Sequence, residues 1–280
     1  MFKKKQIIVV VSVIVLMAML LSLNIKGLVK PKDGRSVGSE STTPAQANVT
    51  TESVSKTAKQ DLNANLAKQI SDLEVSLKSA SETDKPALLK TLAQKWEDVN
   101  QPAPAAFYYE SIAQKENVFS NWLKAGDKFS EAFDNIQDSL IQPVLVQKAS
   151  IAYQNALKLD SSSLDAKTGL GVAYVNGAGA PMEGVSLLRA VVKQDPDNVK
   201  ANMSLGLLSI KSGQYDKAIG RFKTVVAVKP MPEAWFYLAS CYENQGMKDE
   251  AISAYLKSKE LAADPNLGKF VDRKIQELRK

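Results

Sequence analysis

The chain has 280 residues, of which 45% are hydrophobic, 24% charged and 7% aromatic, and this composition excludes a wholly disordered or a collagen-like chain. It has no His and one Cys, which excludes a Ser-His-Asp triad, a Cys-His pair, a His-ligated metal, an intrachain disulfide and a CxxC site. The net charge of +6 lies entirely in residues 1–60, which hold 9 Lys or Arg and 3 Asp or Glu; residues 61–280 hold 27 of each sign. The body therefore has no bulk positive charge that would favour nucleic acid as a partner.

Residues 1–30 have the pattern of a membrane-spanning segment. Lys3, Lys4 and Lys5 precede an apolar run over 7–23, in which two Ser are the only polar residues. At about 1.5 Å per residue this run spans roughly 26 Å as a helix, close to the ~30 Å thickness of a hydrocarbon core. We predict one transmembrane anchor at 1–30.

A cleaved secretory signal peptide and a buried core helix stay open as alternatives for this segment. The run is longer than the ~7–15 residues of a usual signal core, and no small-x-small cleavage site follows it closely. The three Lys before the run favour an N-terminus inside the cytoplasm, although Lys26 and Arg35 on the other side weaken that bias. We therefore expect a single-pass protein of the cell (inner) membrane, with its body outside the cytoplasm, in the periplasm.

Two further segments precede the main body. Residues 31–60 are rich in Ser and Thr and contain no Leu, Ile, Phe, Tyr or Trp, so we predict a disordered linker. An amphipathic lead-in helix is predicted at 61–82, because large apolar residues recur there at spacings of four, four, three and four. This stripe consists of Leu62, Leu66, Ile70, Leu73 and Leu77. The stripe is interpreted either as a short dimerising coiled coil or as a face that packs against the body.

An internal repeat organises the chain from 83 to 265. At an offset of 33 residues, the pairs Leu205-Gly206 with Leu238-Ala239, Gly213 with Gly246, Ala218 with Ala251 and Phe222 with Tyr255 align. The same template predicts five units, at about 86–118, 119–161, 164–197, 199–231 and 232–265, and a polar capping helix at 266–280. The second unit holds roughly nine or ten extra residues, near 134–142, between its two helices. The third has Gly184 where the fourth has Ala218.

This pattern resembles the tetratricopeptide repeat family. The family pattern W-x2-L-G-x2-Y, then A-x3-F, is nearly complete in Trp235, Leu238, Ala239, Tyr242, Ala251 and Tyr255. The departures are the insertion in the second unit and the missing Trp in the third and fourth. The resemblance implies an all-α solenoid of about five helix-turn-helix units, which stack because one helix pair cannot cover its own apolar face.

The resemblance also implies a concave groove that is lined by the first helix of each unit and binds peptides. In the last three units the groove positions are apolar or aromatic: Val172, Val175, Met203, Leu207, Ile210, Phe236 and Tyr237. In the first two units they are polar: Lys90, Gln94, Glu97, Lys124 and Asp127. We expect residues 165–244 to hold an apolar segment of a partner. The alternative is that the lead-in helix or the capping helix covers this surface.

We find no pattern of catalytic, metal-binding or cofactor-binding residues. The GxG matches at 169–171 and 177–179 do not continue as GxGxxG, and no pair of carboxylates stands out as acid and base. The expected function is a non-enzymatic, membrane-tethered scaffold or assembly factor that binds a protein or peptide. A self-associating structural oligomer is the first alternative, and an enzyme or its dedicated subunit is the second.

Overall fold

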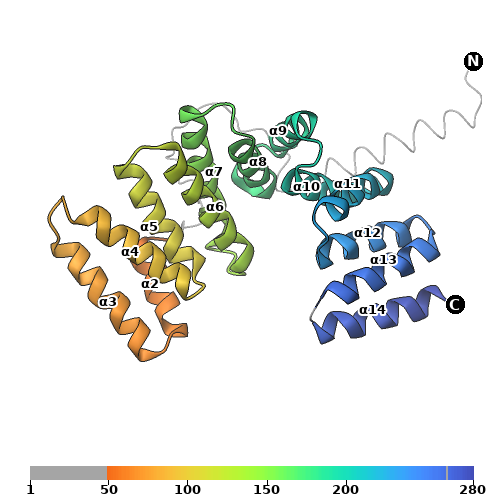
Figure 1. Cartoon of the computed structure of the whole chain (residues 1–280), viewed down its shortest axis with the longest axis horizontal. Helices are drawn as coiled ribbons and strands as arrows, with labels where there is room; N and C mark the ends of the chain where they lie inside the picture. Colours follow the sequence, from red (N-terminus) through yellow and green to blue (C-terminus); the bar gives the residue numbers. More distant parts are fainter. Residues whose placement is uncertain (1–48, 263) are drawn as a thin grey trace, which may run out of the picture. The chain divides into compact units, whose positions relative to one another are not determined.

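The described part of the chain consists of helices joined by short turns, and successive helices pack side by side (Figure 1). The computed structural model describes residues 49–262 and 264–280. The helix pairs are α4 (Lys85–Asp98) with α5 (Pro102–Lys115), α6 (Phe119–Asn135) with α7 (Gln142–Leu159), α8 (Leu164–Ala173) with α9 (Pro181–Gln194), α10 (Val199–Lys211) with α11 (Tyr215–Val228), and α12 (Pro232–Asn244) with α13 (Lys248–Leu261). A last helix, α14 (Pro265–Leu278), packs on α13. Within these residues the prediction of an all-α, solenoid-like fold is confirmed.

Proline and glycine mark where helices begin and turn. Pro occupies the first or second position of α5, α9, α12 and α14, where the missing N–H has no intrahelical acceptor to lose. Gly213 and Gly246 lie in the turns inside the last two pairs, with φ of 70° and 74°. Residues with a Cβ rarely adopt this left-handed conformation, so these glycines allow each chain reversal.

Close contacts between neighbouring helices depend on small residues. A Cβ on Gly206 would lie 2.7 Å from Cζ of Phe222, so the aromatic ring of α11 occupies the space that a side chain on α10 would need. A Cβ on Gly184 would lie 2.6 Å from the carbonyl oxygen of Gly171. The backbones of α8 and α9 therefore approach more closely than an Ala at 184 would permit, which explains why the third unit departs from the Ala of the other units.

The buried clusters extend across unit boundaries. One cluster joins Ala113 of α5, Trp122 of α6, Ala152 of α7 and Ala166 of α8. Another extends from Ala218 of α11 to Ile275 of α14. Because each pair covers its apolar face with the next pair, the units form one continuous stack within the described residues.

The extra residues of the second unit lengthen its first helix. The first helix α6 has 17 residues, whereas α10 and α12 have 13 each. The additional turn carries Phe133 and Asp134, and the chain then passes through residues 136–141 to α7. The insertion was predicted as an expanded turn; about half a helical turn of it belongs to α6 instead.

The linker prediction is wrong for residues 51–60. Helix α2 (Thr51–Ala58) and a 3₁₀ turn, η1 (Lys59–Asp61), occupy them. The side chain of Thr50 accepts a hydrogen bond from the Ser53 N–H in a capping box, and α2 packs on α5. Val54 and Ala58 are small enough to be buried there, so a segment without large apolar residues still gains a packed face.

Helix α3 (Ala64–Ser79) uses its apolar stripe within the protein. Ile70 is buried, and Leu62, Leu73 and Leu77 pack partly buried around a cluster that contains Trp96 of α4. The stripe therefore serves as a packing face, and α3 lies against α4. This is the second of the two interpretations that the sequence allowed.

No helix in the residues that the structure describes is long and apolar enough to cross a bilayer. The predicted anchor at 1–30 and the part of the predicted linker before residue 49 lie outside those residues.

Candidate binding cleft

The first helices of the second to fifth units border a common cleft of about 600 Å³. It receives side chains from α6, from α8 and the π-helical turn η2 (Tyr174–Ala178) that continues it, from α10, and from α12. Five of the seven predicted groove residues line it: Val172, Val175, Met203, Leu207 and Tyr237. The cleft is therefore mainly apolar, the character that the family resemblance implied for this surface.

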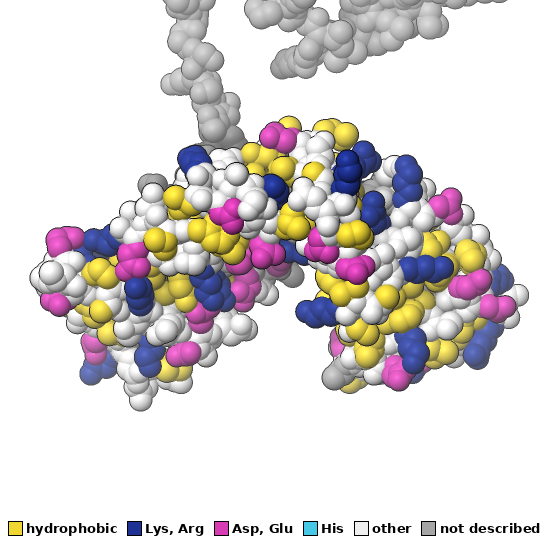
Figure 2. Space-filling view, turned by 45° about the horizontal axis from the view of Figure 1, so that its top comes forward, with side chains coloured by type: hydrophobic (Ala, Val, Ile, Leu, Met, Phe, Trp, Pro, Cys, Tyr) yellow, Lys and Arg dark blue, Asp and Glu magenta, His cyan; other side chains and the backbone are white. Residues whose placement is uncertain are grey.

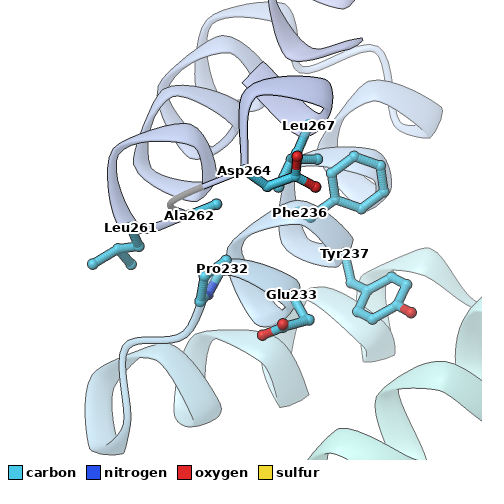
Figure 3. A pocket seen from close by; sticks show the side chains of 8 residues that line it. All are labelled: Pro232, Glu233, Phe236, Tyr237, Leu261, Ala262, Asp264 and Leu267. Atoms are coloured by element: carbon cyan, nitrogen blue, oxygen red, sulfur yellow. The ribbon is translucent and has the colours of Figure 1, made fainter. Parts of the chain in front are cut away.

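The other two predicted residues lie elsewhere. Ile210 packs partly buried against the C-terminal core cluster and does not line the cleft. Phe236 lines a neighbouring pocket of about 430 Å³ together with Leu267 of α14; Tyr237 borders this pocket as well as the cleft, and its ring points away from that of Phe236 (Figure 3). The Phe236 ring lies 5.6 Å from that of Tyr255 and 5.8 Å from that of Phe270, centroid to centroid. The capping helix thus covers Phe236 but contributes nothing to the cleft.

The cleft also contains residues that the repeat template did not predict. Phe133 and Asp134 come from the added turn of α6, and Lys200 and Lys211 come from the two ends of α10. The insertion near 134–142 is the only sequence signal near these two residues: Asp134 lies at its start and Phe133 directly precedes it.

A local break in α8 shapes one wall. The helix widens into η2, and Gly177 within that turn has a non-helical φ of 115°. This break follows directly on Val175 and Asn176, which both line the cleft. π-helical turns are rare and are often found at functional sites.

Charges near α6 and α10 set the electrostatics of one end of the cleft. Lys200 Nζ lies 3.9 Å from Asp127 and 5.9 Å from the ring centroid of Tyr153. Burial raises the pKa of the Asp134 carboxyl above its ordinary value, and the nearby charge of Lys200 offsets part of that effect. Burial and the charge of Asp127 likewise raise the pKa of Tyr153, so this phenol stays neutral.

Two polar groove positions of the first two units, Glu97 and Lys124, form an ion pair with each other. Glu97 lies 3.0 Å from Lys124 and 2.6 Å from Lys128, and it accepts a 2.5 Å hydrogen bond from Tyr109. Burial alone would raise the pKa of Glu97, but these donors outweigh it and hold that pKa at about 2. Figure 2 shows such charged groups interspersed with hydrophobic patches on the surface. The ion pairs leave the apolar cleft as the candidate site for a ligand.

The described residues include no candidate metal centre and one enclosed thiol. Within them, no group of three or more His, Cys, Asp or Glu is placed to hold a metal ion. Burial raises the pKa of Cys241 to about 11, so its thiol is protonated and enclosed. What the described residues offer is an apolar cleft with charges at its ends, on a stack of helix pairs.

The fold and the cleft define a helical repeat protein with a groove along its first helices. Sequence comparison gives the same class: residues 176–235 and 210–266 each match the tetratricopeptide repeat. The resemblance to this family is therefore supported over residues 176–266.

Individual relatives are distant. Superkiller protein 3 of Schizosaccharomyces pombe is 25% identical over 198 residues, which are 67% of this chain. The chain spans only 13% of the length of that protein.

The solved structures that resemble this fold are likewise distant in sequence. A MamA structure covers 60% of this chain and 93% of its own at 22% identity, with a TM-score of 0.46. MamA from residue 41 onward of Desulfovibrio magneticus RS-1 covers 64% and 95% at 20% identity, with a TM-score of 0.48. YrrB, described as a TPR protein with an unusual peptide-binding site, covers 72% and 97% at 15% identity, with a TM-score of 0.44.

Proposed function

We propose that the protein is a non-enzymatic scaffold or assembly factor that is tethered to a membrane and binds an apolar segment of a partner protein. The observation that carries the proposal is the cleft of about 600 Å³ whose walls are formed by Val172, Met203, Leu207 and their neighbours. Tetratricopeptide repeats mediate protein–protein interactions, and an apolar groove on successive helices suits a helix or an extended segment.

Among the described residues, neither of the two expected internal occupants fills the cleft. Its lining contains no residue of α3 or α14, the two elements that were the alternative occupants. Helix α3 packs on α4, and α14 packs on α13. Burial of apolar side chains at about 25 cal/mol per Å² then supplies the driving force for association with an apolar segment.

Binding is tested with variants of the cleft in the full-length chain. Leu207→Asp with Tyr237→Ala places a charge in the cleft and removes an aromatic wall, and Ser204→Arg fills it without removing an apolar contact. We expect both to abolish cross-linking to partner proteins in membranes, with circular dichroism unchanged. The matched control is Leu256→Asp, on α13 outside the cleft, where the leucine is 46% exposed. Unchanged cross-linking by correctly folded cleft variants contradicts the proposal.

The tether and the location rest on the apolar run at 7–23 and the lysines that precede it. We propose that the repeats face the periplasm. The test combines carbonate extraction of membranes with protease treatment of intact cells after the outer envelope is opened. Retention in the membrane with cleavage of the repeats is the expected result. Protection until lysis reverses the orientation, and release of a shortened soluble form means that the segment is a cleaved signal.

Self-association is the alternative function. Met182 and Val75 are 70% and 66% exposed, and a second copy would cover such apolar side chains. Light scattering of the full-length chain over a range of concentrations separates the two functions, because a scaffold that binds other proteins needs no copy of itself. A measured molar mass equal to that of one chain at every concentration contradicts the self-association hypothesis.

A further inference from the structure

Two charges that line the cleft have no salt bridge or hydrogen bond within the described residues. They are Asp134, next to the last residue of α6, and Lys211, the last residue of α10. The remaining charged residue of the lining, Lys200, already lies 3.9 Å from Asp127. Because Lys200 also interacts with Asp134, two carboxylates share one ammonium group near that end of the cleft, whereas Lys211 has no carboxylate partner among the described residues.

These two charges belong to opposite ends of the cleft. The carboxylate of Asp134 interacts with Lys200, the second residue of α10, whereas Lys211 ends the same helix. Lys211 follows Lys200 by eleven positions of the helix, so their Cα atoms are about 16 Å apart along its axis at 1.5 Å per residue. Apolar side chains of α10, Met203 and Leu207, lie between them.

The surroundings of Asp134 favour a cation from outside. Asp134 is exposed beside Phe133 in the lining of the cleft, and it shares the ammonium group of Lys200 with Asp127. A basic side chain brought by a ligand would balance the second carboxylate and donate a charge-assisted hydrogen bond to it.

We propose that the cleft binds an apolar segment with a basic side chain at one end and a carboxylate about 16 Å away, so that Asp134 and Lys211 set the direction in which the segment lies. The distance corresponds to about eleven residues of a helix or about five residues of an extended strand. This inference rests on the proposed function, because it specifies the chemistry of the partner at the same site.

The occupant is a segment of another protein rather than the chain's own apolar run. That run, at 7–23, has Lys3, Lys4 and Lys5 before it and Lys26 after it, with no Asp or Glu until Asp33. It therefore has the basic end but not the acidic end that the cleft requires.

The test selects ligands from a phage-displayed library of random 16-residue peptides on the full-length chain in a non-ionic detergent. We expect the native protein to enrich peptides with an apolar centre, Lys or Arg on one side, and Asp or Glu on the other. The variant Asp134→Lys with Lys211→Glu keeps the net charge and exchanges the two ends, so it is expected to enrich the opposite order. The matched control is Arg273→Glu with Glu277→Lys on α14, which is expected to keep the native order.

A synthetic peptide from the native selection gives the affinity. We expect Asp134→Lys alone to weaken its binding about tenfold at low salt, and less at high salt because the charges are screened. A peptide with its two charged ends exchanged is expected to bind the doubly reversed variant best.

The possible failures are distinguishable. Apolar peptides without a charge order, whose binding still depends on Leu207 and Tyr237, would overturn this inference and leave the proposed function intact. If no enriched peptide depends on Leu207 and Tyr237, the proposed function fails, and this inference fails with it.

Discussion

The ring of Tyr153 lies directly against Gly169, so that a Cβ on Gly169 would come within 2.2 Å of the ring's Cζ. A Cβ on Gly126 of α6 would likewise come within 2.7 Å of Cε1 of the same ring. Tyr153 is fully buried, and its hydroxyl donates a 2.8 Å hydrogen bond to Asp127. One side chain of α7 thus joins α6 and α8 by filling two gaps that only glycine leaves.

Substitution of Gly169 by Ala is therefore expected to destabilise the protein by about 1–3 kcal/mol, as overpacked cores do. The matched control is Gly220→Ala in α11, where a Cβ meets nothing within 4 Å. Because Ala is the better helix former, that control is expected to gain about 0.5–1 kcal/mol. Urea denaturation followed by circular dichroism measures both. Equal effects of the two substitutions would contradict the packing of Tyr153.

Glu74 joins three elements at the N-terminal end of the stack. It accepts hydrogen bonds from Ser55 at 2.5 Å, from Lys59 at 2.6 Å and from Tyr108 at 3.0 Å. We expect Glu74→Gln to cost about 1–3 kcal/mol, since it leaves a half-buried Lys and a Tyr hydroxyl without their charged acceptor.

Limited proteolysis should then cleave α2 and α3 faster in Glu74→Gln than in the native protein. Glu52→Gln is the control, because its 3.8 Å pair with Lys78 is exposed and such pairs contribute little. Cleavage at native rates in Glu74→Gln would show that α2 is held mainly by its apolar contacts.

The two N-terminal helices show what composition could not predict. Residues 51–60 lack large apolar side chains. The prediction of disorder assumed that only the burial of such side chains can offset the entropy cost of ordering the chain. Thr50 caps the helix and Glu74, 19 residues after Ser55, supplies the polar contact. No local pattern reveals a partner at that separation, whereas the stripe of α3 was readable because its spacing repeats every turn.

Acid should destabilise the protein partly through Glu97. The pKa of Glu97 in the folded chain is about 2, below its ordinary value of 4.5, so its ionised form favours folding. The stabilisation is complete above about pH 4.5 and is lost as the pH falls toward 2. In Glu97→Gln the free energy of unfolding should be lower at pH 7 and should change less between pH 5 and pH 2.5.

The comparison needs a control because other carboxylates also titrate in this range. Glu260→Gln removes an exposed carboxylate whose salt bridge, 2.7 Å long, is to Lys257 of the same helix. It should follow the native pH dependence. Parallel curves for Glu97→Gln and the native protein would contradict the role given to Lys124 and Lys128.

The single cysteine reports on the C-terminal repeats. Cys241 has no exposed surface, and burial raises its pKa to about 11, so an aromatic disulfide reagent at pH 8 should not label the native chain within minutes. Labelling is expected to become complete in denaturant. A variant with Cys241→Ser and Ser253→Cys moves the thiol to an exposed position of α13 and should react at once. Fast labelling of the native chain would mean that α12 opens readily.

The candidate site was predictable only in part. Val172, Met203 and Leu207 were named because the family resemblance assigns groove positions within each unit: Val172 and Leu207 are the ninth residues of the units that begin at 164 and 199, and Met203 is the fifth residue of the latter. Phe236 was misplaced to the groove because the template ignores the helix that follows the last unit, where Phe270 lies 5.8 Å from it. Phe133 and Asp134 were not predicted as cleft residues, because the insertion that begins beside them has no counterpart in the other units.

The capping helix has a consequence for how copies of the protein meet. Val271 and Ile275 of α14 are buried against the last unit, while Lys269, Asp272 and Arg273 are exposed. At the other end, α3 packs its apolar stripe inward. Polymer growth by head-to-tail addition needs a broad free apolar face at each end of a subunit, and the ends of the described stack offer only the exposed Val75 on α3 and a mainly charged outer surface on α14. Assembly through the described residues would therefore proceed sideways, through the flanks of the helices.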